Sequence, residues 1–385
     1  MGFSNKSKLL IVDDSAFMRK LISDFFDGNL KIEVVGTARN GVDAINKIQQ
    51  LKPDVVTMDV EMPEMNGLDA LKVIMEKCPV PVIMLSSTTI NGAKNTLNAM
   101  ENGAVDFVAK PSGTISLDLH KIKEELVHKV EHAAHVSVAK LKKPIGHKNI
   151  STKFANDIIK KREITPMKNS TTTKNYKIAK EVNASTRKNQ WSNNSKKIVL
   201  IGTSTGGPRA LQEVITKLPK SINAPILIVQ HMPPGFTKSL AERLNQLSNI
   251  EVKEAEHGDV LINGKAYIAP GGSHLKIKKL NSQFQIILDQ NEPPRSGHRP
   301  AVDVMFENVS QFSEFDKIAV IMTGMGYDGS KGLIELKQKG NTIAIAESAD
   351  TCIVYGMPKA AVETQLVDEI VDVDDIAQTI MKYLP

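Results

Sequence analysis

The chain has 385 residues, of which 41% are hydrophobic and 24% are charged. This length exceeds one ordinary hydrophobic core, and the composition is that of a globular protein, so we expect two domains. No apolar run approaches the ~20 residues of a membrane-spanning helix, which argues against membrane insertion. Cys78 and Cys352 lie far apart and no secretory signal opens the chain, so we expect a cytoplasmic protein without disulfides.

The net charge of +6 is concentrated in one segment. Residues 131–195 hold 14 Lys+Arg and 4 Asp+Glu, whereas the rest of the chain carries 35 basic and 39 acidic side chains. The segment is rich in Asn, Ser and Thr and has few periodic apolar residues, which predicts a basic flexible linker. A basic arm for nucleic acid or a membrane surface is the alternative interpretation. Because the folded regions have no basic excess, we expect no nucleic-acid partner.

Before this linker, short apolar strands alternate with helical patterns. We expect strands at Lys8–Val12, Ile32–Ala38, Val55–Asp59, Val82–Ser86 and Val105–Ala109. Amphipathic helices separate them, and the last helix carries Leu119, Ile122, Leu126 and Val130 on one face. This alternation predicts an α/β domain with a doubly wound parallel sheet over residues 6–125.

Polar residues follow the strands of this first domain. The carboxyl ends carry, in order, Asp13 and Asp14, then Asp59, Ser86 and Lys110. Three neighbouring carboxylates repel one another unless a cation joins them, and a small cluster of oxygen ligands suits Mg²⁺. A lysine and a hydroxyl beside them suit an arriving phosphoryl group. Singly, the aspartates could cap the next helix and the lysine could simply end a strand; together they favour a phosphorylation site.

The motifs IVDDS, VVTMDVEMPEMNGLD and VDFVAKP resemble the signatures of the response-regulator receiver family. The resemblance implies a flavodoxin-like domain that a histidine kinase phosphorylates on Asp59. It further implies that Ser86 and Lys110 sense the phosphoryl group. The Mg²⁺ ligands would be Asp13, Asp14, Asp59 and the backbone carbonyl of Glu61.

After the linker the alternation resumes. We expect strands at Ile198–Gly202, Ile226–Gln230, Ala266–Ala269, Phe284–Leu288, Ile318–Thr323 and Thr342–Ala346. Several are continuous apolar runs, as a sheet covered on both faces requires. The pattern predicts a second doubly wound α/β domain over residues 196–385.

A Gly-rich turn, GTSTGGP, joins the first strand of this domain to a helix and contains Ser204. The Gly-x-Ser-x-Gly spacing fits a nucleophile elbow, but the same turn could hold a phosphate or a dinucleotide. A base and a carboxylate at neighbouring strand ends would decide between them. His231 directly follows ILIVQ, and Asp328 lies in the TGMGYDG loop that follows IAVIMT. A phosphate-binding loop would not require His231 or Asp328, whereas a Ser-His-Asp triad explains all three residues. We therefore favour the triad.

Both partners also have plain interpretations, since a histidine can end a strand and an aspartate often precedes glycine in a turn. Four other residues are less well placed for the triad: His257, Asp259, His274 and His298. A nucleotide-binding module would need an acidic residue after its second strand, where Gln230 and His231 stand. A transcriptional regulator would need a basic output domain with a recognition helix. Both alternatives are weaker than a hydrolase.

Six ordered motifs of residues 196–385 resemble the chemotaxis protein-glutamate methylesterase family of the CheB type. They are IGTSTGGPRAL, VQHMPPGFTKSLAERLN, YIAPGGSHL, HRPAVDVMF, MTGMGYDGSKGL and AESADTCIVYGMPKAA. The resemblance implies a Rossmann-like hydrolase that demethylates glutamate γ-methyl esters on methyl-accepting chemoreceptors, often with deamidation of particular receptor glutamines. We expect a monomer that needs no cofactor for the ester reaction. The Met325 backbone N–H would help to stabilise the oxyanion.

Phosphorylation would uncover the active site, although a long linker lowers the effective concentration of a blocking domain.

Overall fold

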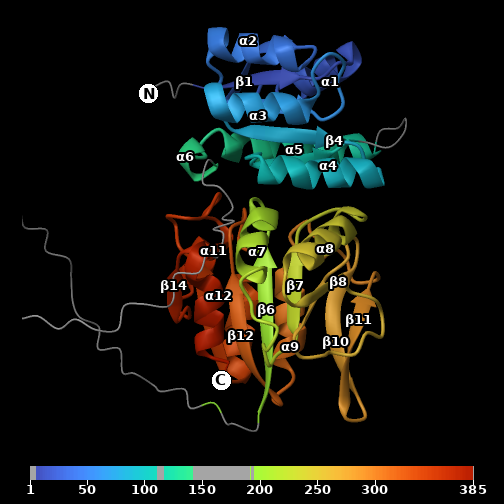
Figure 1. Cartoon of the computed structure of the whole chain (residues 1–385), viewed down its shortest axis with the longest axis vertical. Helices are drawn as coiled ribbons and strands as arrows, with labels where there is room; N and C mark the ends of the chain where they lie inside the picture. The colour runs from blue at the N-terminus through green and yellow to red at the C-terminus, as the bar shows by residue number, and fades with distance from the viewer. Residues whose placement is uncertain (1–5, 111–116, 142–190, 192–194, 385) are drawn as a thin grey trace, which may run out of the picture.

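The computed structural model describes residues 6–110, 117–141, 191 and 195–384. These residues form two domains, each a parallel sheet between layers of helices, as the sequence predicts (Figure 1). In the part of the chain that is described, no helix is both long and apolar enough to cross a membrane.

The first domain contains a five-stranded parallel sheet of order β2-β1-β3-β4-β5. Its central strands are fully buried because they are continuous apolar runs with helices on both faces. The strands are β1 (Ser7–Val12), β2 (Ile32–Ala38), β3 (Val55–Asp59), β4 (Val82–Ser86) and β5 (Asp106–Ala109). The helices are α1 (Ala16–Phe25), α2 (Gly41–Leu51), α3 (Gly67–Lys77), α4 (Ile90–Glu101) and α5 (Leu117–Ala133).

Helix α5 continues into the first residues of the predicted linker, and the short α6 (Val138–Leu141) follows it. Leu126 and Val130 of α5 are buried against the sheet. The rest of the predicted linker, apart from Trp191 and Ser195, lies outside the described residues.

The second domain contains a seven-stranded parallel sheet of order β14-β13-β12-β6-β7-β9-β8. Its strands are β6 (Lys196–Thr203), β7 (Ile226–Gln230), β8 (Glu251–Glu254), β9 (Lys265–Ile268), β12 (Phe315–Ile321), β13 (Thr342–Glu347) and β14 (Glu369–Val371). The helices are α7 (Gly207–Ile215), α8 (Phe236–Leu247), α9 (Val302–Ser310), α10 (Ser330–Lys339), α11 (Met357–Glu363) and α12 (Val373–Lys382).

An antiparallel hairpin lies beside this sheet. It joins β10 (His274–Leu280) to β11 (Gln283–Asp289), with His274 opposite Asp289. The strand expected at Phe284–Leu288 is therefore present as part of β11, but it belongs to the hairpin and not to the parallel sheet.

Strand β6 lies at the centre of the second sheet, at the point where the order of the strands reverses. The chain leaves β6 toward β7 on one side and later returns to β12 on the other side. In open α/β sheets the crevice at the carboxyl ends of such strands is where functional groups collect. Ser204, His231 and the loop that contains Asp328 follow β6, β7 and β12 at this rim.

Candidate active site

The turn that carries Ser204 is held against the loop that follows β12. The Ser204 N–H donates to the Thr323 carbonyl at 3.0 Å, and the Gly207 N–H donates back to the Ser204 carbonyl at 2.7 Å. A side chain at Gly324 would bring its Cβ within 2.8 Å of the Ser204 Cβ. The loop can approach the serine this closely because residue 324 is glycine.

His231 and Asp328 meet across the same rim. His231 Nε2 and Asp328 Oδ2 are 2.8 Å apart, and both side chains are almost fully buried. An ionised carboxylate only accepts, so the bond requires a hydrogen on Nε2 and leaves the lone pair on Nδ1. His231 Nδ1 is buried and has no hydrogen-bond partner among the described residues. This arrangement leaves one ring nitrogen able to take a proton.

The Asp328 carboxylate is stabilised as an anion at the start of α9. It accepts the Val302 N–H at 2.7 Å and the Asp303 N–H at 2.9 Å, both from the first turn of that helix. Burial alone would raise the pKa of Asp328, but the hydrogen bond from His231 and the two backbone N–H groups hold it below the usual value. A charged carboxylate is therefore available to orient the imidazole.

The ring of His298 stacks on the ring of His231. The ring centroids are 3.9 Å apart and the planes are inclined by 11°. A turn with left-handed backbone at Ser296 and Gly297 precedes His298 and delivers its ring to this position. Burial of the ring, followed by the charge of His231, lowers the pKa of His298. His298 is thus an uncharged ring that packs against His231. The sequence pattern did not indicate this contact.

The Ser204 hydroxyl makes no hydrogen bond to His231 or to another described residue. Such contacts are often long in a resting enzyme and tighten when substrate binds. Near the serine, the N–H groups of Thr205 and Met325 donate no hydrogen bond to the rest of the described chain. Both are therefore available to an oxyanion, and the N–H after a nucleophile commonly has this role.

The other histidines considered from the sequence lie elsewhere. His257 accepts the Leu288 N–H through Nδ1 at 3.3 Å, and His274 is buried with Nε2 3.2 Å from the Pro293 carbonyl. Both contacts belong to the β10–β11 hairpin and its flanking loops, so neither histidine takes part in the His231–Asp328 pair.

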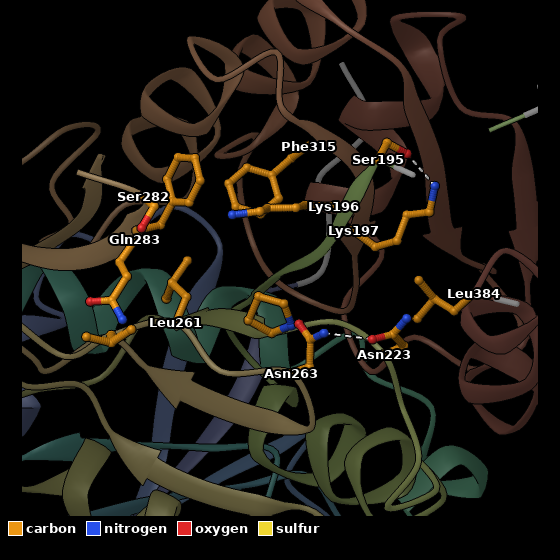
Figure 2. Close-up of a pocket in the computed structure, with 13 residues that line it drawn as sticks. Ser195, Lys196, Lys197, Asn223, Leu261, Asn263, Ser282, Gln283, Phe315 and Leu384 are labelled. Atoms are coloured by element: carbon orange, nitrogen blue, oxygen red, sulfur yellow. Dashed lines mark hydrogen bonds between the residues drawn. The ribbon is translucent and has the colours of Figure 1, made fainter. Parts of the chain in front are cut away.

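A cleft of about 640 Å³ lies at the opposite end of β6. Figure 2 shows Lys196 and Lys197 at its edge, with Asn223 and Asn263 joined by a hydrogen bond across from them. Strand β6 has eight residues, so this cleft is roughly 26 Å from the Ser204 turn at the usual rise of a strand. The cleft does not belong to the rim that carries Ser204, His231 and Asp328.

The first domain brings together most of the residues expected at its acidic pocket. One carboxylate oxygen from each of Asp13, Asp14 and Asp59 lies within 4.8 Å of the other two. Lys110 Nζ is 2.8 Å from both Asp13 Oδ2 and Asp59 Oδ2. Burial raises the pKa of Asp59 to about 6, against the opposing hydrogen bond and charge of Lys110. This set of hard oxygen donors fits Mg²⁺.

Ser86 does not reach this cluster in the structure. Its buried hydroxyl donates to the Gly92 carbonyl in α4 at 3.0 Å and more weakly to the Ser87 carbonyl. The residue expected to sense a phosphoryl group is instead bonded to the helix that faces the second domain.

The first domain lies over the carboxyl-end rim of the second domain's sheet, with α4 and α5 facing it (Figure 1). Thr205, the residue after Ser204, donates its hydroxyl hydrogen to Asp106 Oδ2 of β5 at 2.5 Å. The next residue of β5, Phe107, stacks on Phe236 of α8 with ring centroids 4.7 Å apart. Both contacts join the domain that contains Asp59 to the immediate surroundings of Ser204.

Two further charged contacts lie at this interface, one between the domains and one within the first domain. Arg243 of α8 binds Glu101 of α4 through two parallel hydrogen bonds of 2.8 and 3.0 Å. Lys129 of α5 lies 3.4 Å from Asp106, and although burial alone would lower its pKa, the charges of Asp106 and Glu125 raise it. The interface therefore combines an apolar centre with charged residues at fixed positions.

An α/β domain with an acidic pocket, packed over a Ser, His and Asp at the rim of a second α/β sheet, is the arrangement of a response regulator with a hydrolase output domain. Comparison with known proteins gives the particular family. Residues 9–120 match the response regulator receiver domain, and residues 199–380 match the CheB methylesterase family. The chain belongs to the protein-glutamate methylesterase/protein-glutamine glutaminase family.

Two curated relatives carry that name and extend over both domains. The protein from Geobacillus kaustophilus is 52% identical over 98% of this chain and 98% of its own length. The protein from Bacillus subtilis is 50% identical over 97% of each chain. Among solved structures, the Thermotoga maritima CheB methylesterase catalytic domain is 45% identical and covers 49% of this chain and 100% of its own, with a TM-score of 0.47.

Proposed function

We propose that this chain hydrolyses glutamate γ-methyl esters on chemoreceptors, releasing methanol, and that phosphorylation of Asp59 controls the reaction. The names of its full-length relatives support the reaction class. The observation that carries the proposal is the 2.8 Å contact between His231 Nε2 and Asp328 Oδ2 at the rim that also holds Ser204.

In the first half of the reaction, His231 Nδ1 takes the proton of Ser204 as Oγ attacks the ester carbonyl. Asp328 keeps the hydrogen on Nε2 and stabilises the imidazolium that forms. The carbonyl oxygen becomes negatively charged and accepts hydrogen bonds from the free N–H groups of Thr205 and Met325. The carbon–oxygen bond to the methoxy group then breaks, and the imidazolium proton leaves with it as methanol.

In the second half, water attacks the acyl-serine while Nδ1 of His231 takes its proton. Return of that proton to Ser204 Oγ releases the enzyme and a free glutamate carboxylate. A glutamine side chain would follow the same route with ammonia as the leaving group, which accounts for the second activity in the relatives' names. Deamidation by this chain is therefore part of the proposal.

The acidic pocket would accept the regulatory phosphoryl group. An Asp59 carboxylate oxygen attacks the phosphorus of a phosphohistidine in a partner kinase, and the bond from phosphorus to histidine nitrogen breaks. Asp13, Asp14 and Asp59 would hold Mg²⁺, which neutralises charge on the phosphoryl oxygens when it is bound. Lys110 is already within ion-pair distance of Asp59 and would move to the phosphoryl group.

Direct contacts would carry this signal between the domains. If the Ser86 hydroxyl turns toward the phosphoryl group, it releases the Gly92 carbonyl of α4. Lys110 directly follows β5, whose Asp106 and Phe107 touch the second domain. Helix α4 and strand β5 both contact the second domain, so transmission does not have to cross the long linker.

Methanol release from methylated receptor membranes tests the proposal. The full chain is compared with Ser204→Ala and Asp59→Asn, each with and without acetyl phosphate as the phosphodonor. We expect Ser204→Ala to lose activity by at least about 10³-fold. Asp59→Asn should keep the basal rate without stimulation. Near-normal turnover by Ser204→Ala would contradict the proposed nucleophile.

A further inference from the structure

Gln230 is a buried polar residue between the proposed nucleophile and base. It is the last residue of β7, pairs with Thr203 at the end of β6, and is 2% exposed. Ser204 and His231 are the next residues along these two strands. Regular pairing of the two strands stops at Thr203 and Gln230, and beyond it the His231 N–H still donates to the Thr203 carbonyl at 3.2 Å. Further contacts from a side chain help to fix the positions of the residues that follow.

The side-chain amide of Gln230 supplies those contacts. Its Nε2 donates to the Ser204 carbonyl at 3.0 Å and to the His231 carbonyl at 3.1 Å. Its Oε1 accepts the Thr203 hydroxyl at 2.6 Å. Carbonyls can only accept, so the NH₂ group must face them and the orientation of the amide is determined. One planar group thus joins the backbone of both proposed catalytic residues.

The packing around this amide leaves it little freedom. A Cβ on Gly207, the first residue of α7, would lie 1.9 Å from Gln230 Oε1. The helix therefore closes on the amide only because this residue is glycine. The Ser204 carbonyl also accepts the Gly207 N–H, so the same helix start holds both the amide and the nucleophile turn.

We propose that Gln230 is a positioning residue that sets the separation of Ser204 and His231. This inference rests on the proposed esterase function. The amide acts through the two main-chain carbonyls and does not touch the reacting atoms. A displacement of about 1 Å between reacting groups can lower a rate by about 100-fold, so loss of this bridge should reduce kcat more than substrate binding.

Gln230→Met tests the bridge because methionine has a similar length and no amide hydrogen bonds. In the full chain with acetyl phosphate we expect kcat for methanol release to fall about 10- to 100-fold, with KM within about threefold of wild type. Labelling of Ser204 by a fluorophosphonate should slow by a similar factor. This second readout measures nucleophile reactivity without the receptor.

Thr342→Val is the matched control. Thr342 is also buried, and its hydroxyl donates to the Leu336 carbonyl at the far end of the same sheet. This variant should lose stability while keeping kcat and the labelling rate. If Gln230→Met does not fold, Thr203→Val removes the 2.6 Å hydrogen bond to Oε1 together with a weak 3.4 Å contact to the Val229 carbonyl, and kcat should still fall severalfold.

Three outcomes would overturn the inference. The first is that Gln230→Met loses no more kcat than Thr342→Val, and the second is that only its KM changes. The third, for use if that variant does not fold, is unchanged kcat in Thr203→Val. Near-normal esterase activity in Ser204→Ala would instead disprove the proposed function, so the two failures are distinguishable.

Discussion

Asp303 and Asp328 hold the starts of two neighbouring helices together. Each carboxylate accepts hydrogen bonds from backbone N–H groups at the start of the other residue's helix. Asp328 precedes α10 and accepts the Val302 and Asp303 N–H groups of α9. Asp303 Oδ1 in turn accepts the N–H groups of Gly329 and Gly332 at 2.9 and 2.7 Å. The two helix starts therefore hold each other, and this fixes the carboxylate that orients His231.

The first prediction concerns the charge of this pair. Burial, and secondarily the charge of Asp328, raises the pKa of Asp303 to about 6. The folded state therefore binds more protons than the unfolded state between about pH 4 and pH 6, and stability from this group is lost as pH rises through that window. Relative to Asp303→Asn, wild type should lose about 2 kcal/mol of unfolding free energy between pH 4.5 and 7.5. Urea titrations of both proteins that stay parallel over this range would contradict it.

The second prediction concerns the contact between Asp106 and Thr205. A hydrogen bond to a charged partner contributes about 1.5–3 kcal/mol, so its loss should open the interface and raise basal activity about 10-fold. We expect Asp106→Ala to release methanol at this higher rate without a phosphodonor. Lys72→Ala, which removes only an exposed ion pair on α3, is the control and should not change the rate. An unchanged basal rate in Asp106→Ala would exclude this contact as a restraint.

The strands and the positions of the proposed triad could be predicted because continuous apolar runs determine both. Strands β3, β4 and β7 have the bounds expected from VVTMD, VIMLS and ILIVQ. Polar residues that follow such runs lie at the carboxyl rim, and with the Gly-x-Ser-x-Gly turn and the Gly-rich loop after IAVIMT this pattern predicts Ser204, His231 and Asp328. The edge strands β8 and β14 were not predicted because they have only 4 and 3 residues and no continuous run of buried residues.

Contacts between loops could not be predicted in this way. His298 lies 67 residues after His231, and no periodicity indicates that the two rings stack. The amide of Gln230 has three partners that depend on how two loops close on it. The domain interface could not be predicted from the sequence either. The linker sequence suggests a weakly held receiver, whereas complementary surfaces on α4, β5 and α8 bring the domains into contact.

The third prediction concerns the stacking of His298 on His231. Aromatic stacking contributes about 0.5–1.5 kcal/mol, so His298→Ala should lower kcat by about 2- to 10-fold. His298→Phe keeps a flat ring and should retain most of the activity, because the low pKa of His298 leaves its ring uncharged at neutral pH. Methanol release by the phosphorylated full chain measures both variants. Equal losses in Ala and Phe would show that stacking is not the relevant property.

The fourth prediction concerns the ion pair of Glu101 and Arg243 at the edge of the interface. Its paired hydrogen bonds join α4 to α8 without touching the proposed active site. Both side chains are partly exposed, so the pair contributes about 1 kcal/mol. Glu101→Arg or Arg243→Glu alone places like charges together and should raise basal methanol release about 3- to 10-fold.

The double exchange of Glu101→Arg with Arg243→Glu restores opposite charges and should return the basal rate to within about twofold of wild type. With acetyl phosphate, all four proteins should share one rate, because the pair acts on closure of the interface and not on the reaction. Added salt should raise the basal rate of wild type more than that of the single variants, since it screens an attraction that they have already lost. Additive effects in the double variant would show that the two residues act independently and that their contact does not restrain the receiver.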